Sequence, residues 1–307
     1  MKSFAFAALL VLAAVPVAQA EPIDLAAFKA LPQPAPTAIL SYGNASSQAV
    51  DVFLPKGAGP FPVAVLIHGG CWRDLPGAGR EQLRAFGAEL ARRGIAAWSI
   101  GYRRADEAGG GYPGTFADIA TAIDRLRAEA AHYDLDLTRT VAVGHSAGGH
   151  LALWAAARDR LPAESPLRRD EPFIPRAVIS LGGIGDLEAF ARFVPVLCGP
   201  GVIDKLAPGG SYAEVSPAAL PPPESTVTMI SGILDRLVPP YVARDYANAV
   251  RRKQGAEVAL MDIPEAGHFD LVAPGTTAWE HVRRRIEFAL ELDTDGADRA
   301  SRVPGKP

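Results

Sequence analysis

The chain has 307 residues, of which 49% are hydrophobic and 21% are charged, and its formal net charge is −3. The apolar fraction excludes an intrinsically disordered chain, and 31 basic against 34 acidic residues argue against a protein that binds nucleic acid or anionic membranes. Two cysteines are too few for a disulfide framework or a cysteine-rich zinc site.

Residues 1–20 have the pattern of an export signal. Lys2 supplies a positive charge, residues 4–15 form an apolar run, and the segment ending at Ala20 has the small-x-small pattern of a signal-peptidase site. The alternative is a transmembrane anchor, which requires a longer apolar run than the one that Pro16 interrupts. We therefore expect export, with cleavage after Ala20, to the periplasm or the outside of the cell.

Short apolar runs alternate with helical patterns along most of the chain. Residues 63–67 (VAVLI) show no polar alternation, which is typical of a strand buried on both faces, whereas residues 115–130 carry apolar residues at helical spacing. The predicted strands cover residues 50–54, 63–67, 95–100, 140–143, 177–181, 227–230 and 258–263, and the predicted helices cover residues 80–93, 115–130, 147–158, 241–253 and 277–290.

This alternation predicts one α/β domain over residues 37–292, with a mostly parallel, twisted sheet of about eight strands and helices on both faces. Residues 21–36 are rich in proline, and we expect an extended arm there. Residues 190–224 are irregular and too long for a simple connection, which indicates a small cap insertion. The polar residues 293–307 are predicted to be a disordered tail.

Gly144-His145-Ser146-Ala147-Gly148 matches the G-x-S-x-G motif and lies directly between a predicted strand and a predicted helix. A sharp turn between those two elements exposes the serine hydroxyl above the sheet. The five-residue pattern also occurs by chance in glycine-rich turns, but the strand and the helix beside it favour a nucleophile. We therefore predict that Ser146 is the catalytic nucleophile.

A second motif, His68-Gly69-Gly70-Cys71-Trp72, follows the predicted strand 63–67. Attack on a carboxylic ester creates an oxyanion, which hydrolases stabilise with backbone N–H groups from the residue after the nucleophile and from a glycine loop. His68 is interpreted as a structural residue that braces this loop. The predicted oxyanion donors are Gly70, Cys71 and Ala147, with Gly69 as an alternative.

A serine nucleophile needs a base and an acid that orients the base. His268 is the one histidine in the loop after the last predicted strand, since His281 lies in the final predicted helix, and we predict that His268 is the base. Asp235 follows the preceding strand and gives the chain order Ser, Asp, His, so it is the predicted acid. Asp186, after an earlier strand, is the rival. The other histidines are His68, His132, His145, His150 and His281.

Together these motifs resemble the α/β-hydrolase superfamily, in particular the esterase branch of kynurenine-formamidase-like and BD-FAE-like enzymes that carry HGGxW and GHSAGGHL. The resemblance extends over residues 50–290 and includes Tyr102-Arg103, Ser216-Pro217 and the segment from Gly267 to Asp270. It implies an α/β-hydrolase fold and a serine triad that uses no cofactor. One residue departs from the family pattern, because Cys71 stands where these enzymes usually carry glycine or tyrosine.

The two cysteines leave two alternatives open. Cys71 and Cys198 are both expected above the same strand ends, and an exported protein meets oxidising conditions, so a disulfide between them is one alternative. The other is a pair of buried thiols that act as small apolar residues. The sequence does not fix the distance that a bridge requires.

The leading hypothesis is a secreted serine carboxylesterase for small acyl or aromatic esters, with Trp72 as a wall of the substrate pocket. An arylformamidase that cleaves an N-formylkynurenine-like amide is the alternative, although export argues against it. A further alternative is a non-catalytic binding protein on a hydrolase scaffold, which the presence of all three triad residues disfavours. The histidines lack metal-binding spacing, and no phosphate-binding loop follows a strand, so neither a metal nor a cofactor is predicted.

Overall fold

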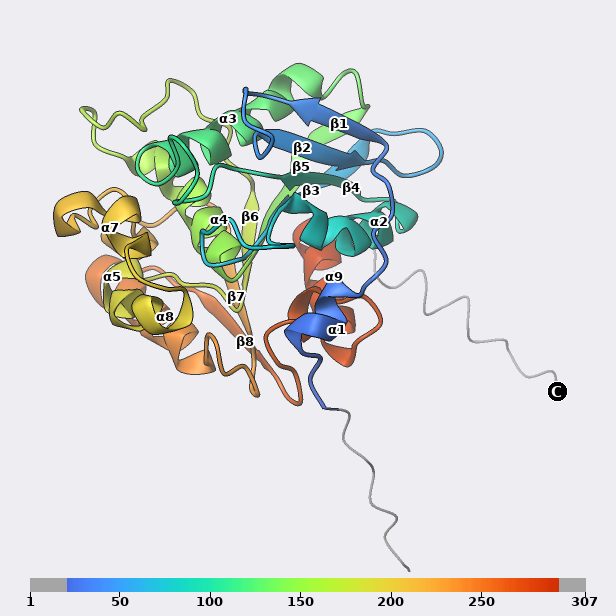
Figure 1. The fold of residues 1–307 in the computed structure, drawn as a ribbon. Helices are drawn as coiled ribbons and strands as arrows, with labels where there is room; N and C mark the ends of the chain where they lie inside the picture. The colour runs from blue at the N-terminus through green and yellow to red at the C-terminus, as the bar shows by residue number, and fades with distance from the viewer. Residues whose placement is uncertain (1–20, 293–307) are drawn as a thin grey trace, which may run out of the picture.

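The computed structural model describes residues 21–292, which form one mixed sheet with helices on both faces (Figure 1). The predicted export signal (1–20) and the predicted tail (293–307) lie outside the described residues. Within residues 21–292, no helix is both long enough and apolar enough to cross a membrane.

The sheet has eight strands in the order β1-β2-β4-β3-β5-β6-β7-β8. β2 pairs antiparallel with both of its neighbours, and every later pair in this order is parallel. The predicted fold class is therefore confirmed. The strands are β1 (Ala38–Ser41), β2 (Ala49–Phe53), β3 (Phe61–Ile67), β4 (Ala96–Ile100), β5 (Leu135–His145), β6 (Ala177–Leu181), β7 (Thr226–Gly232) and β8 (Ala259–Ile263).

Two hydrophobic cores lie on opposite faces of this sheet. In β3, Val63 and Val65 belong to one core, whereas Ala64 and Leu66 belong to the other, because successive strand side chains point to opposite faces. The first core is covered by α3 (Gly114–Glu129), α4 (Ala147–Ala157) and α8 (Pro240–Gln254), and the second by α2 (Arg84–Arg92) and α9 (Thr277–Ala289). A 3-10 turn, Arg80–Leu83, precedes α2.

The predicted extended arm differs from the structure. Asp24 caps a short helix, α1 (Leu25–Lys29), by accepting a hydrogen bond from the Ala27 N–H at 2.8 Å. Phe28 on this helix is buried in the second core, which fixes the helix against the domain. The arm is thus part of the folded structure rather than a simple extended lead.

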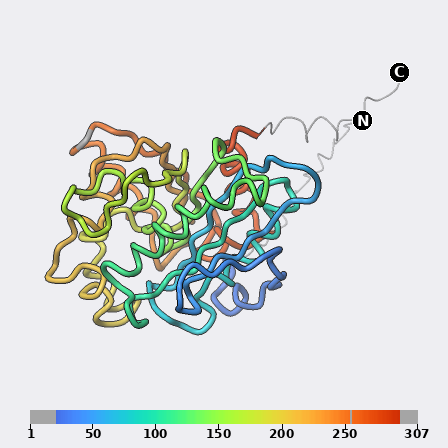
Figure 2. Tube along the Cα trace, turned by 90° about the horizontal axis from the view of Figure 1, so that it is seen from above, coloured from blue at the N-terminus to red at the C-terminus, as the bar shows by residue number. Residues whose placement is uncertain are grey.

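The predicted cap insertion connects β6 to β7 through short helices. These are α5 (Leu187–Phe190), α6 (Val194–Leu197) and α7 (Val202–Leu206), followed by 3-10 turns. In Figure 1 this insertion is drawn in yellow to gold, with α7 at the left of the view and strand β1 at the upper right, and Figure 2 shows the same yellow to gold segment at the lower left. It begins at Leu187, three residues before the predicted boundary.

Candidate active site

Ser146 lies on the sharp turn between β5 and α4. Its backbone has φ 54° and ψ −120°, a region that residues other than glycine rarely adopt. A side chain at Gly144 would collide with the Gly148 carbonyl, and one at Gly148 with the Ile67 carbonyl, which explains the glycines of the motif. The turn is held by the Ser146 N–H, which donates to the Leu181 carbonyl of the neighbouring strand at 2.9 Å.

His268 and Asp235 meet beside this turn. His268 Nδ1 lies 2.6 Å from Asp235 Oδ2, and both side chains are buried. The other carboxylate oxygen accepts the Leu237 and Val238 N–H groups, each at 2.8 Å. Because a carboxylate only accepts, the proton of His268 resides on Nδ1, which leaves Nε2 as the basic nitrogen.

Among residues 21–292, no side chain or backbone group forms a hydrogen bond with the Ser146 hydroxyl, so the hydroxyl and His268 Nε2 are not yet in hydrogen-bond contact. Such contacts are often long before substrate binds and then tighten. Ser146 and His268 nevertheless line the same cavity, with Asp235 behind the imidazole. The structure therefore brings the three predicted residues to one site.

The rival acid, Asp186, serves another purpose. It caps α5 by accepting a hydrogen bond from the Ala189 N–H at 3.1 Å, and the carboxylate that bonds to His268 is that of Asp235. Gly182, which follows the same strand as Asp186, packs against the Asp235–His268 pair. A Cβ there would lie 3.0 Å from Asp235 Oδ2 and 3.1 Å from His268 Nδ1. Gly182 was not predicted as a site residue, although the Gly182-Gly183 pair at a strand end indicates a close approach of the backbone.

The glycine loop, residues 68–72, approaches the serine from the other side. A Cβ at Gly69 would lie 3.1 Å from Ser146 Cβ, so the loop and the turn are in direct contact. Gly70, Cys71 and Trp72 all have positive φ, of 105°, 59° and 52°. Within residues 21–292, no acceptor pairs with the backbone N–H of Gly70, Cys71 or Ala147. These three predicted donors are therefore available for a ligand.

A cavity of about 270 Å³ joins the serine turn, the glycine loop and the insertion. Its walls are mainly apolar and come from segments far apart in the chain. Besides Ser146 and His268 they include Leu25, Phe28, Leu75, Ile184, Phe190, Leu197, Leu237, Val238 and Phe269.

Trp72 also borders this cavity, but its side chain is only 1% exposed. The indole Nε1–H donates to His150 Nδ1 at 3.2 Å, and the ring belongs to the core on the α3 and α4 side of the sheet. Trp72 therefore borders the cavity, and its contact with His150 also supports the glycine loop.

Helix α1 supplies part of the cavity that sequence analysis missed. The Phe28 ring stacks on Phe269, the residue after His268, with 5.2 Å between ring centroids. Leu25 and Lys29 of the same helix also line the cavity. The sequence signal for this helix is the capping residue Asp24 followed by the apolar residues Leu25 and Phe28.

We expect Phe28→Ala to raise KM for apolar esters by about ten-fold, because burying an aromatic or aliphatic group contributes about 1.5–3 kcal/mol and 1.4 kcal/mol is a factor of ten. Turnover at saturation should change less, since Phe28 does not contact the reacting groups. Steady-state kinetics on esters of increasing acyl length provide the measurement. Phe288→Ala, at a site that is 67% exposed on α9, is the matched control. An unchanged KM for Phe28→Ala would remove α1 from the substrate pocket.

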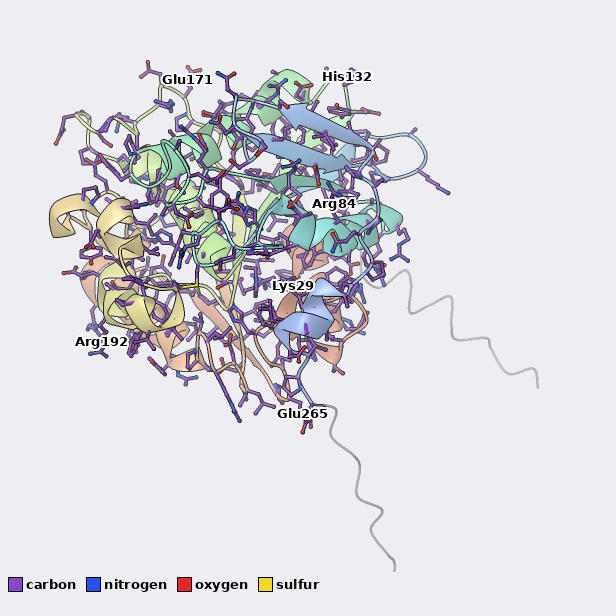
Figure 3. All side chains as sticks on the ribbon, in the orientation of Figure 1. Lys29, Arg84, His132, Glu171, Arg192 and Glu265 are labelled. Atoms are coloured by element: carbon purple, nitrogen blue, oxygen red, sulfur yellow. A yellow bond between two sulfur atoms is a disulfide. The ribbon has the colours of Figure 1, made fainter. Side chains whose placement is uncertain are left out.

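Three further histidines are buried around the site and serve structural contacts. His68 Nδ1 lies 2.8 Å from the Gly69 carbonyl, and its ring stacks on Tyr102. His145 Nε2 lies 3.1 Å from the His268 carbonyl. His150 Nε2 lies 2.7 Å from the Val215 carbonyl. The interpretation of His68 as a structural residue agrees with these contacts. Of the histidines not near the site, His132 lies at the outer edge of the molecule (Figure 3).

Burial lowers the pKa of all three, to about 3 for His68, to about 4 for His150, and well below 6.5 for His145, where the neighbouring His268 lowers it further. The unfolded chain therefore binds more protons than the folded chain below pH 6.5, and acidification should destabilise the fold. We expect the free energy of unfolding to fall by about 1.4 kcal/mol per pH unit for each of the three histidines once the pH is well below 6.5.

Denaturant unfolding between pH 6.5 and 5 measures this loss in a window where the carboxylates of lowered pKa, such as Asp106 and Glu107, stay ionised. His150→Gln should reduce the slope of the unfolding free energy against pH by the contribution of one histidine. His132→Gln, at an exposed position, should leave that slope unchanged. A stability that does not depend on pH in this window would contradict the expectation.

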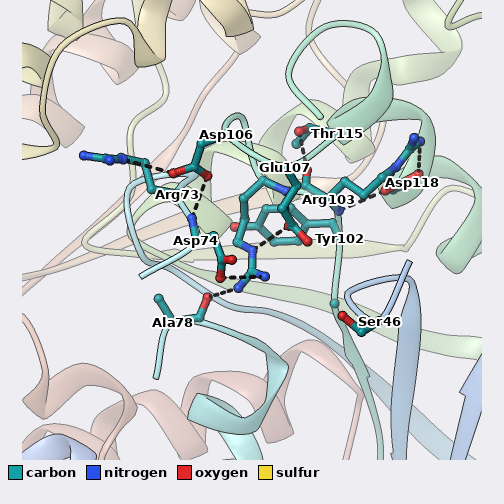
Figure 4. A network of polar contacts seen from close by, with 12 residues as sticks. Ser46, Arg73, Asp74, Ala78, Tyr102, Arg103, Asp106, Glu107, Thr115 and Asp118 are labelled. Atoms are coloured by element: carbon teal, nitrogen blue, oxygen red, sulfur yellow. Dashed lines mark hydrogen bonds and ion pairs between the residues drawn. The ribbon is translucent and has the colours of Figure 1, made fainter. Parts of the chain in front are cut away.

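Figure 4 shows a network of polar contacts around Tyr102 and Arg103. The Tyr102 hydroxyl donates to the His68 carbonyl at 3.0 Å. Arg103, the next residue, donates through its backbone N–H and its guanidinium to buried Asp118, at 2.7 to 2.9 Å. The Tyr102-Arg103 pair therefore ties the start of the glycine loop to helix α3.

Cys71 and Cys198 form a disulfide, with 5.3 Å between their Cα atoms. The bond connects the glycine loop to the insertion and resolves the two alternatives that the sequence left open. No cluster of three or more potential metal-ligating side chains occurs among residues 21–292.

Comparisons with known proteins agree with this geometry. The BD-FAE family profile matches residues 50–193, a segment that contains both the glycine loop and Ser146. The chain is an α/β-hydrolase related to the BD-FAE family. This α/β-hydrolase is 29% identical to esterase LipC of Mycobacterium tuberculosis over 280 residues, which cover 82% of this chain and 66% of LipC. It is 23% identical to the kynurenine formamidase of Salmo salar, with coverage of 75% and 74%.

Among solved structures, a thermophilic esterase from Thermogutta terrifontis, Est2, aligns with a TM-score of 0.67 at 23% identity. The alignment covers 86% of this α/β-hydrolase and 96% of the esterase, which supports the fold. The chain spans just under two thirds of the length of LipC.

Proposed function

We propose that this α/β-hydrolase is a serine carboxylesterase that cleaves small acyl or aromatic esters. The observation that carries the proposal is the cavity in which Ser146, the His268–Asp235 pair and three free backbone N–H groups converge. A nucleophile, an oriented base and oxyanion donors at one place are the components of acyl transfer through a covalent intermediate. Similarity to proteins named as esterases supports the same reaction.

In the proposed mechanism, Ser146 Oγ attacks the ester carbonyl carbon while His268 Nε2 accepts the hydroxyl proton. Asp235 keeps the proton of His268 on Nδ1 and stabilises the imidazolium. When the tetrahedral intermediate collapses, His268 returns the proton to the departing alcohol. Water then attacks the acyl-enzyme by the same steps and releases the acid and Ser146.

The negative charge of the tetrahedral intermediate is assigned to the N–H groups of Gly70, Cys71 and Ala147. Ala147 is the first residue of α4, so its N–H has no partner within the helix, and the helix N-terminus favours an anion. Removal of one such donor typically costs a hydrolase about 10²–10³ in kcat. The glycine loop is therefore as important to the proposal as the triad.

The cavity supports a small substrate. Its volume of about 270 Å³ and its leucine and phenylalanine walls suit a short acyl chain or an aromatic ring. A series of p-nitrophenyl esters with acyl chains from acetate to dodecanoate provides the test. The proposal predicts the largest kcat/KM for short chains, with a decline once the acyl group outgrows the cavity. No turnover on any ester would favour a non-catalytic binding protein.

An arylformamidase activity is the second candidate. It is favoured by the similarity to the kynurenine formamidase of Salmo salar and by aromatic walls at Phe28, Phe190 and Phe269. The same nucleophile and oxyanion donors would act on a formamide carbonyl. Parallel assays with N-formylkynurenine and phenyl acetate separate the two, and a higher kcat/KM for the formamide would select the second candidate.

We further propose that the protein is exported by residues 1–20 and functions outside the cytoplasm. The Cys71–Cys198 bond supports this location, because structural disulfides persist in oxidising compartments. Mass analysis of the secreted or periplasmic protein should find Glu21 as the first residue. A protein that keeps Met1 and stays in the cytoplasm would contradict the proposal.

A further inference from the structure

The glycine loop adopts a backbone that its own residues disfavour. Cys71 and Trp72 are consecutive residues with left-handed φ values of 59° and 52°. For residues other than glycine this conformation costs roughly 1–2 kcal/mol each. Glycine at position 70 tolerates its φ of 105°. The Arg73 N–H donates to the Gly70 carbonyl at 2.9 Å and closes a turn over the next two residues, which outside contacts also hold. The contacts of the loop therefore decide where the Cys71 N–H points.

Trp72 is held by the body of the domain. Its carbonyl accepts the Ala105 N–H at 2.6 Å, and its indole donates to His150. Ala105 lies outside the insertion, whereas His150 also contacts the Val215 carbonyl of the insertion at 2.7 Å. The indole is buried in the core on the α3 and α4 side of the sheet. These contacts fix the end of the glycine loop but do not touch the side chain of Cys71.

Cys71 is held by the insertion. Its disulfide partner Cys198 directly follows α6 and lies 127 residues later in the chain. Arg73 Nη1 donates to the Cys198 carbonyl at 3.0 Å, and the Arg73 guanidinium also pairs with Asp106 at 3.3 Å (Figure 4). Asp106 in turn accepts the Asp74 N–H at 2.7 Å. The disulfide and this ion pair thus act on the same short stretch of chain.

The insertion has few other attachments at this point. Three successive residues of α6, Pro195 to Leu197, are exposed, and Val196 is 88% exposed. Val194 is the buried residue of the helix. Leu197 and Cys198 nevertheless line the cavity, beside the Cys71 end of the glycine loop. The bond therefore joins two walls of the cavity, one of which carries the oxyanion donor.

We propose that the Cys71–Cys198 disulfide positions the Cys71 N–H for oxyanion stabilisation, so that full activity requires the oxidised enzyme. This inference rests on the proposed ester hydrolysis and assigns Cys198 as a positioning residue for it. A dithiol breaks the S–S bond by donating two electrons and two protons, which leave two cysteine thiols and a disulfide of the reagent. Oxidised glutathione reverses the step, accepting two electrons and two protons.

Cys198→Ser is the direct test, because it removes the bond and leaves the Cys71 backbone unaltered. We expect kcat on p-nitrophenyl acetate to fall by about 10²-fold, as for a lost oxyanion donor, with KM changing by less than about three-fold. Val196→Ser, two residues away and exposed, is the matched control and should retain wild-type kinetics. A kcat within two-fold of wild type for Cys198→Ser would overturn the proposal, as would an effect confined to KM.

Reduction of the folded wild-type enzyme covers the case in which Cys198→Ser does not fold. Dithiothreitol is added under native conditions, and circular dichroism, free thiols and activity are followed together. Loss of kcat with two free thiols and an unchanged spectrum, restored by oxidised glutathione, supports the proposal. Full activity with two free thiols overturns it, and so does loss of activity only in step with unfolding.

The proposed function is judged separately in the same series. Oxidised wild-type enzyme must hydrolyse the ester, and Ser146→Ala must not. An oxidised enzyme that hydrolyses no ester would refute ester hydrolysis itself, whatever the state of the disulfide. An active oxidised enzyme whose reduced form is equally active would refute only the positioning role of the bond.

Discussion

Ser146→Ala should lower kcat for ester hydrolysis by at least about 10⁴-fold while leaving the fold unchanged. The reason is that no other hydroxyl lies between His268 and the free N–H groups of the cavity among its described lining residues, so the covalent route is lost. Removal of a triad member leaves only the contribution of binding and of the oxyanion donors. Initial rates on p-nitrophenyl acetate at saturating substrate measure the loss.

The matched control for this variant is Ser211→Ala, which removes a hydroxyl from an exposed turn of the insertion. It should retain wild-type kcat and KM. Circular dichroism and thermal unfolding of both variants exclude a change in folding. A Ser146→Ala enzyme with residual activity near that of wild type would contradict the assignment of the nucleophile.

Asp235→Asn should have the second-largest effect, a loss of kcat of about 10⁴-fold with little change in KM. The new amide would donate to His268 Nδ1, which moves the ring proton to Nε2 and removes the base. The contacts that hold the loop should survive, because the asparagine oxygen still accepts the Leu237 and Val238 N–H groups. Steady-state kinetics together with a proton NMR spectrum of the imidazole N–H groups measure both changes.

Asp186→Asn is the control for this experiment, since asparagine also caps helices well. It should change kcat by less than two-fold, because Asp186 bonds to Ala189 rather than to His268. If Asp186→Asn caused the larger loss, the assignment of the acid would have to pass to the rival residue.

The sheet was predictable because its strands are apolar runs separated by clear turns. The predicted strand 63–67 ends where β3 ends, the predicted strand 177–181 coincides with β6, and the predicted helix 147–158 differs from α4 by one residue. The predicted strand 140–143 covers only part of β5, which begins at Leu135. Parallel strands present their carboxyl ends at one edge of the sheet, so the loops that carry Ser146, Asp235 and His268 had to converge there. The chain order of motifs was thus enough to bring these residues together.

Other features depended on tertiary contacts that no local pattern encodes. Helix α1 has five residues, too few to be stable alone, and it is fixed by Phe28 against Phe269. The disulfide depends on the distance between two Cα atoms that are 127 residues apart in the chain. The Trp72 indole donates to His150, which lies 78 residues later in the chain. Each of these features is set by the meeting of two distant segments.

The central claim is that Ser146 is a nucleophile activated in this cavity. The most direct measurement is reaction of the purified protein with a fluorophosphonate probe, followed by mass spectrometric mapping of the modified peptide. The account predicts one adduct, on Ser146, that is absent from Ser146→Ala and forms far more slowly on Asp235→Asn. No adduct, or an adduct on another residue in an enzyme that still hydrolyses esters, would contradict it.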